Sequence, residues 1–337
     1  MSGTGAHGTG AHGTRAEVLW PDRLELGEGI RWVDGRIVLV DILSGRLLAA
    51  PPGDRAGQGL AELTRLPVAL GAVAPVEGRP GSWIAAAGPG ICLLDTAGGP
   101  GPGADDGTGA GADDGAGTGA DAGIRWLARP EDGAPVRMRM NDATADPHGR
   151  FWAGSMAYDD IEGAGSLYRV DRDGTVTRVL SGITVPNGPA FSGDGETLFL
   201  ADSARGLIRR YPVDPVTGEL GEPSVFTTLD TGGPDGMAVD AEGGLWTAVW
   251  GEGVVHRYRP DGALDQVVRV PAAQPAGVCL GGEDGRTLFV TSARTGLSRP
   301  VPFDGAVFAV RVEVPGLPTA SYRPDPGNGS PDPGSGS

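Results

Sequence analysis

The chain has 337 residues, and its 43 Asp and Glu outnumber its 27 Lys and Arg, giving a formal net charge of -16. Such an acidic balance argues against nucleic-acid binding, which needs a basic surface. The 2 cysteines are too few for a disulfide framework. Cys92 and Cys279 fall in non-adjacent repeats of the chain, so we expect reduced thiols and a cytoplasmic location.

The two ends and one internal segment have a composition that predicts disorder. Residues 1–15 repeat the unit GTGAH without an apolar run, so they form neither a signal peptide nor a membrane segment. Residues 323–337 are rich in Gly, Pro and Ser, and residues 98–122 are almost all Gly, Ala, Asp, Thr and Pro. We therefore expect one domain over residues 16–322, interrupted by an acidic, glycine-rich insertion at 98–122.

A turn with glycine followed by a short apolar strand recurs along the domain. Once the insertion is set aside, the period is about 45 residues, which is typical of one four-stranded propeller blade per repeat. No stretch shows a sustained helical period. The repeats predict an all-β, six-bladed β-propeller, and the turn glycines are Gly35, Gly81, Gly149, Gly195, Gly243 and Gly285.

Four repeats carry an oxygen-bearing side chain at one register, seven or eight residues before the turn glycine: Glu28, Asn141, Asn187 and Asp235. The other two repeats have Val73 and Gly277 there. Rotation about one axis brings equivalent positions together, so we expect the four side chains to converge at the mouth of a central channel. A glycine follows Glu28, Asn187 and Asp235, which allows a sharp turn toward the axis.

Carboxylate and carboxamide oxygens favour a hard divalent cation, with Ca²⁺, Mg²⁺ or Mn²⁺ preferred over Zn²⁺, for which no paired His or Cys set exists. The alternative is structural, because polar residues at these positions can cap strands or hold channel water.

Four sequence blocks, in order, resemble the regucalcin/gluconolactonase family, also called the senescence marker protein and luciferin-regenerating-enzyme-like family: LGEGIRW, RMNDATADPHGRFWAGSM, VPNGPAFS and GPDGMAVDAEGGLWTA. The resemblance covers residues 24–289. It implies a six-bladed propeller with one catalytic divalent cation, Ca²⁺ first, whose ligands match Glu28, Asn187 and Asp235.

The resemblance also implies substrate contacts. Arg139 and Asn141 match the family's substrate-binding pair, and Asp159 aligns with a glutamate of the sugar lactonases. Tyr158 and Trp250 are further candidates for the wall of the pocket.

The function predicted from these residues is metal-dependent hydrolysis of a lactone, with Asp235 as general base. No G-x-S-x-G elbow is present, which disfavours serine chemistry. Two alternatives stay open: a phosphotriesterase or arylesterase using the same metal site, and a non-catalytic propeller that binds calcium or a protein partner. A small-molecule lactone is the expected ligand, with no nucleic acid and no membrane as partners.

Overall fold

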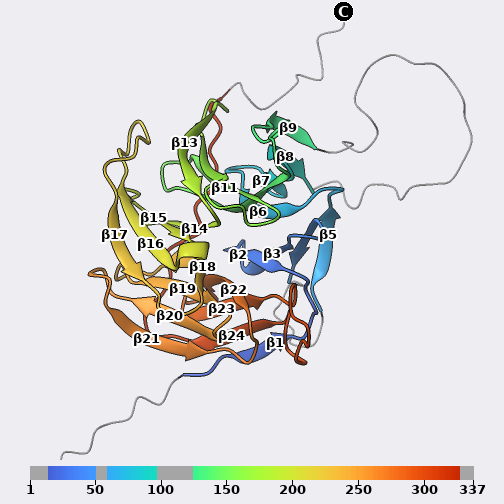
Figure 1. Cartoon of the computed structure of the whole chain (residues 1–337), viewed down its shortest axis with the longest axis vertical. Helices are drawn as coiled ribbons and strands as arrows, with labels where there is room; N and C mark the ends of the chain where they lie inside the picture. The colour runs from blue at the N-terminus through green and yellow to red at the C-terminus, as the bar shows by residue number, and fades with distance from the viewer. Residues whose placement is uncertain (1–13, 51–58, 97–123, 327–337) are drawn as a thin grey trace, which may run out of the picture.

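The computed structural model describes residues 14–50, 59–96 and 124–326. In these ranges the chain forms six four-stranded antiparallel sheets arranged as a ring (Figure 1). The predicted six-bladed β-propeller is confirmed. One 3-10 turn, η1 (Ser203–Arg205), is the only helical element of the described residues, and none of them forms a helix long and apolar enough to span a membrane.

Each blade takes four strands, and in the first five blades the innermost strand comes first in the chain. The strands are β1 (Glu17–Trp20), β2 (Gly27–Val33), β3 (Arg36–Asp41), β4 (Arg46–Ala49), β5 (Ala61–Arg65), β6 (Leu70–Pro75), β7 (Ser82–Ala87), β8 (Gly90–Asp95), β9 (Arg125–Ala128), β10 (Met138–Ala145), β11 (Phe151–Ala157), β12 (Gly165–Val170), β13 (Val176–Ile183), β14 (Pro186–Phe191), β15 (Thr197–Asp202), β16 (Leu207–Pro212), β17 (Ser224–Thr228), β18 (Gly233–Val239), β19 (Leu245–Trp250), β20 (Val254–Tyr258), β21 (Leu264–Arg269), β22 (Pro275–Gly281), β23 (Thr287–Ser292) and β24 (Val307–Arg311).

The ring closes by joining the two ends of the domain. β1 pairs antiparallel with β24, so the first strand of the chain is the outermost strand of the last blade. Closure of this kind leaves only short edges exposed. The described structure begins before residue 16, since Arg269 N donates to Thr14 O at 2.9 Å. The predicted insertion at 98–122 lies outside the described residues, as do residues 1–13 and 327–337.

The repeat glycines lie where the sequence predicts, in turns that connect the first and second strands of the blades. All have positive φ, from 69° at Gly285 to 88° at Gly149, a region that other residues rarely adopt. In the third and fifth blades a buried aspartate fixes the same turn. Asp146 accepts a hydrogen bond from Trp152 Nε1 at 2.9 Å, and Asp240 accepts one from Trp246 Nε1 at 2.9 Å.

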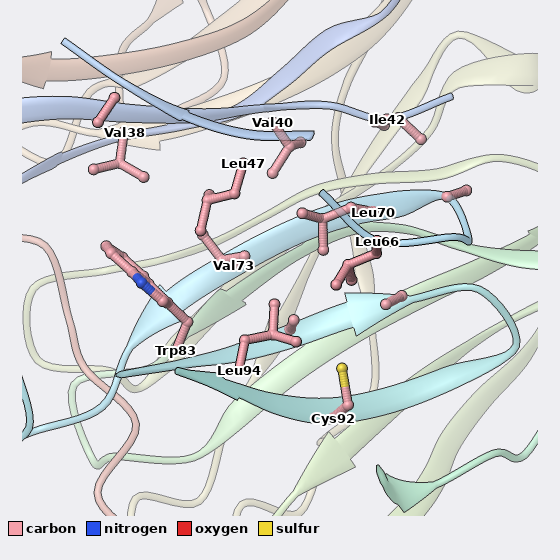
Figure 2. Close-up of a cluster of buried hydrophobic side chains, with 14 of the residues drawn as sticks. Val38, Val40, Ile42, Leu47, Leu66, Leu70, Val73, Trp83, Cys92 and Leu94 are labelled. Atoms are coloured by element: carbon pink, nitrogen blue, oxygen red, sulfur yellow. The ribbon is translucent and has the colours of Figure 1, made fainter. Parts of the chain in front are cut away.

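The core consists of apolar layers between neighbouring blades. Figure 2 shows the layer between the first two blades, where Val40 and Leu47 face Leu70, Val73 and Trp83. All five side chains are at least 97% buried. Burying an aliphatic side chain of this size contributes roughly 1.5–3 kcal/mol, so these layers hold each inner strand, and the side chains it carries, in place.

The chain beyond β24 covers one end of the central channel. Gly316 bridges to Asp240 of the fifth blade and Tyr322 bridges to Val76 of the second. Tyr322 also donates through its hydroxyl to Asp171 O at 3.1 Å. Arg323 N donates to Gly149 O at 3.0 Å, so the ordered chain runs past residue 322, where the sequence predicted that it ends. Contacts with the second, third and fifth blades hold this segment in place.

Candidate active site

The oxygen-bearing side chains at the repeat register converge. Glu28 on β2, Asn141 on β10, Asn187 on β14 and Asp235 on β18 line one cavity of about 610 Å³. Each is 4–6% exposed. The structure therefore brings together four residues that are spread over more than half of the sequence.

A β-bulge aims each of these side chains. The pairing register shifts between Glu28 and Arg31, between Asn187 and Ala190, and between Pro234 and Met237. A bulge bends a strand and redirects a side chain. The candidate ligands thus lie inside the inner strands, at their bulges.

Glycine has two roles at these bulges. Gly29 and Gly188 follow Glu28 and Asn187 and have φ values of 54° and 51°. Elsewhere glycine makes room: a Cβ on Gly277 would lie 3.0 Å from Glu28 Oε2, and one on Gly71 would lie 2.1 Å from Asn141 O. The two blades without an oxygen-bearing side chain at this register therefore leave space for the site residues of the neighbouring blades.

A chain of hydrogen bonds orients the carboxamides. Arg139 Nη1 donates to Asn141 Oδ1 at 2.6 Å, and Asn141 Nδ2 donates to Asn187 Oδ1 at 2.7 Å. Asn187 Nδ2 in turn donates to Ser203 Oγ at 2.9 Å. Ser203 was not predicted, because nothing in its local sequence marks it; it comes from η1 and is fixed by donating to Pro234 O at 2.6 Å.

The two carboxylates are in direct contact. Burial, followed by the nearby charge of Asp142, raises the pKa of Glu28 to about 8. Burial and the charge of Glu28 raise the pKa of Asp235 well above its ordinary value, and the two side chains hydrogen bond to each other. Two buried carboxyl groups in contact cannot both ionise without a nearby cation. They share a proton, or they bind a cation in its place.

Asp142 is a third buried carboxylate, which the sequence analysis missed. Its oxygens accept hydrogen bonds from Gly188 N at 2.9 Å and Ala143 N at 2.8 Å, and Arg31 Nη2 lies 3.8 Å away. Asp142 therefore holds the backbone next to Asn187. The sequence did offer one signal for Asp142, its place directly after Asn141. In a regular strand, however, adjacent side chains point to opposite faces, so Asp142 would be expected to point away from the site.

Not all of the predicted substrate residues line the cavity. Arg139 is 7% exposed and lines the cavity, as do Tyr158 and Trp250. Asp159 and Asp160 are both exposed, but only Asp160 contributes to the lining. The reason is the turn after β11, in which Asp160 adopts φ 50° and its N–H donates to Ala157 O at 3.3 Å. The turn brings Asp160 back to the cavity and leaves Asp159 outside.

The donor set fits a hard divalent cation. Among the described residues, no group of three or more His, Cys, Asp and Glu side chains has metal-binding geometry. A cation here would thus take two carboxylates together with carboxamide oxygen, an all-oxygen set that suits Ca²⁺, Mg²⁺ or Mn²⁺.

The fold and the cavity define a six-bladed propeller with oxygen-bearing side chains at its channel, and comparison with known proteins gives its family. Residues 26–294 match the model of the SMP-30/Gluconolactonase/LRE-like region, and the chain belongs to this family. The resemblance seen in the sequence is confirmed.

Individual relatives span much of the chain. A 6-deoxy-6-sulfogluconolactonase of Pseudomonas putida is 35% identical over 303 residues, which is 86% of this chain and 92% of that protein. An L-arabinolactonase of Azospirillum brasilense is 38% identical over 56% of this chain and 65% of that protein. The crystal structure of a calcium-binding protein, regucalcin, from Agrobacterium tumefaciens superposes with a TM-score of 0.77 at 31% identity, covering 92% of this chain and 98% of that chain.

Proposed function

We propose that this protein is a divalent-metal-dependent hydrolase that opens the ring of a sugar lactone. The observation that carries the proposal is the contact between the buried carboxyl groups of Glu28 and Asp235 at a cavity whose wall presents Arg139 and Asn141. The activities for which the Pseudomonas putida and Azospirillum brasilense relatives are named support lactones as the substrate class.

Glu28, Asn187 and Asp235 would hold the cation. Ca²⁺ is our first choice, because the Agrobacterium tumefaciens neighbour is described as calcium-binding, and Mg²⁺, Mn²⁺ or Zn²⁺ are the alternatives. When bound, a divalent cation supplies Lewis acidity toward the lactone carbonyl and displaces the proton that Glu28 and Asp235 share.

The residues of the chain perform the remaining steps. Asp235, once ionised, accepts a proton from water as the water oxygen attacks the carbonyl carbon. Collapse of the tetrahedral centre breaks the acyl carbon–oxygen bond of the ring, and Asp235 returns the proton to the leaving oxygen. Arg139 and Asn141 hold substrate oxygens during this exchange, and Asp160 accepts a hydrogen bond from a substrate hydroxyl. The product is the open-chain hydroxy acid.

One feature of the cavity favours a second candidate. Its wall includes Leu26, Ile42, Met156 and Trp250, an apolar surface that would accommodate an aryl group. Hydrolysis of aryl esters or phosphotriesters at the same carboxylates is therefore the second candidate.

Proton release distinguishes these candidates. Protein treated with chelator and then reloaded with Ca²⁺, Mg²⁺, Mn²⁺ or Zn²⁺ is given aldonolactones, p-nitrophenyl acetate and paraoxon, and the uncatalysed rate is subtracted. The proposal requires metal-dependent acid release from aldonolactones above that from the other two substrates. Preference for the aryl ester or the phosphotriester supports the second candidate, and metal binding without turnover of any substrate leaves a non-catalytic propeller.

A cytoplasmic site of action is part of the proposal. Within the described residues, Cys92 and Cys279 are free thiols, and both are buried. Thiols of this kind are compatible with a reducing compartment.

A further inference from the structure

Tyr158 separates the candidate active site from a second cavity. This second cavity has a volume of about 560 Å³, and Leu43 and Tyr158 line both cavities. Its other side is formed by the segment that leads into β10, including Arg137 and Met138. A ligand bound above the carboxylates can therefore extend past the Tyr158 ring into the second cavity.

Arg137 lies where it would contact the part of a ligand that extends past Tyr158. Its Cζ lies 4.1 Å from the centroid of the Tyr158 ring, while Arg139 Cζ lies 5.9 Å from the same centroid. Tyr158 N also donates to Arg137 O at 3.0 Å, which fixes the two residues together. A guanidinium stacked on a ring keeps the N–H donors on its edge available for a carboxylate, sulfonate or phosphate.

The acidic groups around this cavity have other partners. Asp132 forms an ion pair with Arg129 at 2.7 Å, and Glu131 accepts hydrogen bonds from Ser155 and Tyr168. None of the ion pairs formed by the described residues includes Arg137. Arg137 is exposed, in contrast to the buried Arg139. Although the chain as a whole carries a net charge of -16, Arg137 offers an exposed guanidinium that no carboxylate occupies. Such a group can donate charge-assisted hydrogen bonds to an anion.

We propose that Arg137 and Tyr158 form a subsite for an anionic substituent, so that the preferred lactone carries a negatively charged group at the end remote from its ring carbonyl. The inference rests on the proposed lactonase function and names its substrate class. The sulfonated lactone in the name of the Pseudomonas putida relative is an anion of this type.

Three lactones test the subsite: neutral D-glucono-1,5-lactone, D-glucaro-1,4-lactone with a carboxylate, and 6-deoxy-6-sulfogluconolactone with a sulfonate. We expect Arg137→Gln to lower kcat/KM for at least one charged lactone by about tenfold, mainly through KM, because a charge-assisted hydrogen bond is lost. The loss on the neutral lactone should be much smaller. The charged lactone that loses most identifies the anion, and added salt should weaken the wild-type preference.

Arg178→Gln is the matched control, since Arg178 is an exposed arginine on β13, the outermost strand of the same blade. Equal losses on neutral and charged lactones in Arg137→Gln, or no loss on either charged lactone, would overturn the subsite while leaving the lactonase proposal intact. If the wild type hydrolyses no lactone with any metal, the proposed function fails and the subsite fails with it.

Discussion

Asn141 Nδ2 lies 2.7 Å from Asn187 Oδ1, so a residue of the third blade fixes the carboxamide oxygen that the fourth blade would offer to a cation. Asn141 is itself held by Arg139 Nη1 at 2.6 Å. The residues assigned to substrate and those assigned to metal thus form one hydrogen-bonded unit. We therefore expect a substitution at Asn141 or Arg139 to alter metal affinity as well as substrate binding.

Asn141→Ala tests this coupling. Loss of the donor frees Asn187 to rotate, and a hydrogen bond of this kind contributes about 1 kcal/mol. We expect the metal concentration for half-maximal activity to rise severalfold, together with a fall in kcat/KM. Ser203→Ala removes the other partner of Asn187 and leaves the Arg139–Asn141 pair in place. It should raise the metal requirement and change kcat/KM at saturating metal much less. An unchanged metal requirement in both variants would show that Asn187 needs neither partner.

Asp160→Ala and Asp159→Ala form a matched pair on one turn. Both residues are exposed, but only Asp160 lines the cavity. Loss of a charged acceptor for a substrate hydroxyl costs about 1.5–3 kcal/mol, so kcat/KM for a hydroxylated lactone should fall roughly tenfold to a hundredfold in Asp160→Ala. Asp159→Ala should behave as the wild type. The reverse ranking in steady-state kinetics would show that Asp159 binds the substrate hydroxyl, as the family resemblance implies.

The metal-free protein should lose stability as the pH rises. The pKa of Glu28 is raised from its ordinary value of 4.5 to about 8, so its folded form favours the proton. Its contribution to stability is then complete below pH 4.5 and is lost as the pH rises toward 8. Urea unfolding of chelator-treated protein at several pH values measures this loss. Glu28→Gln cannot ionise and should lose less stability over the same interval, and an equal slope in both proteins would refute the assignment.

Asp142→Ala should destabilise the fold around the site. It leaves the N–H groups of Ala143 and Gly188 without their acceptor and the half-buried Arg31 without its nearest carboxylate. Each unsatisfied buried group costs about 1–3 kcal/mol. Release of repulsion toward Glu28 and Asp235 opposes this cost, so Asp142→Asn, which removes the charge and keeps one acceptor, should be the milder change. Urea unfolding that ranks Asp142→Asn as the more destabilised variant would contradict this account.

The sequence was sufficient for the fold and for the convergence of four side chains, because a turn glycine marks the same point in each blade. Asp235 and Asn187 could be found by counting back from that glycine. The same count failed in the second blade, where it reaches Val73, a residue of the core layer in Figure 2. There the bulge lies between Leu70 and Ala72. A shift of one residue moves a strand side chain to the opposite face.

The remaining site residues depend on contacts that a single sequence does not display. Ser203 reaches Asn187 only because η1 follows the second strand of the same blade. Asp142 is recognisable through its acceptance of a hydrogen bond from Gly188, which is far along the chain. Asp160 replaces Asp159 at the cavity because of the backbone conformation of one turn.

The most direct test of the central claim compares Asp235→Asn with Glu28→Gln in proton release from an aldonolactone, titrated with Ca²⁺. Asparagine keeps an oxygen for the cation but accepts no proton at neutral pH. We therefore predict that kcat at saturating Ca²⁺ falls by roughly 10²–10⁴ in Asp235→Asn, whereas Glu28→Gln mainly raises the Ca²⁺ concentration required. An unchanged kcat in Asp235→Asn at saturating Ca²⁺, or a wild-type rate that chelator does not lower, would contradict the claim.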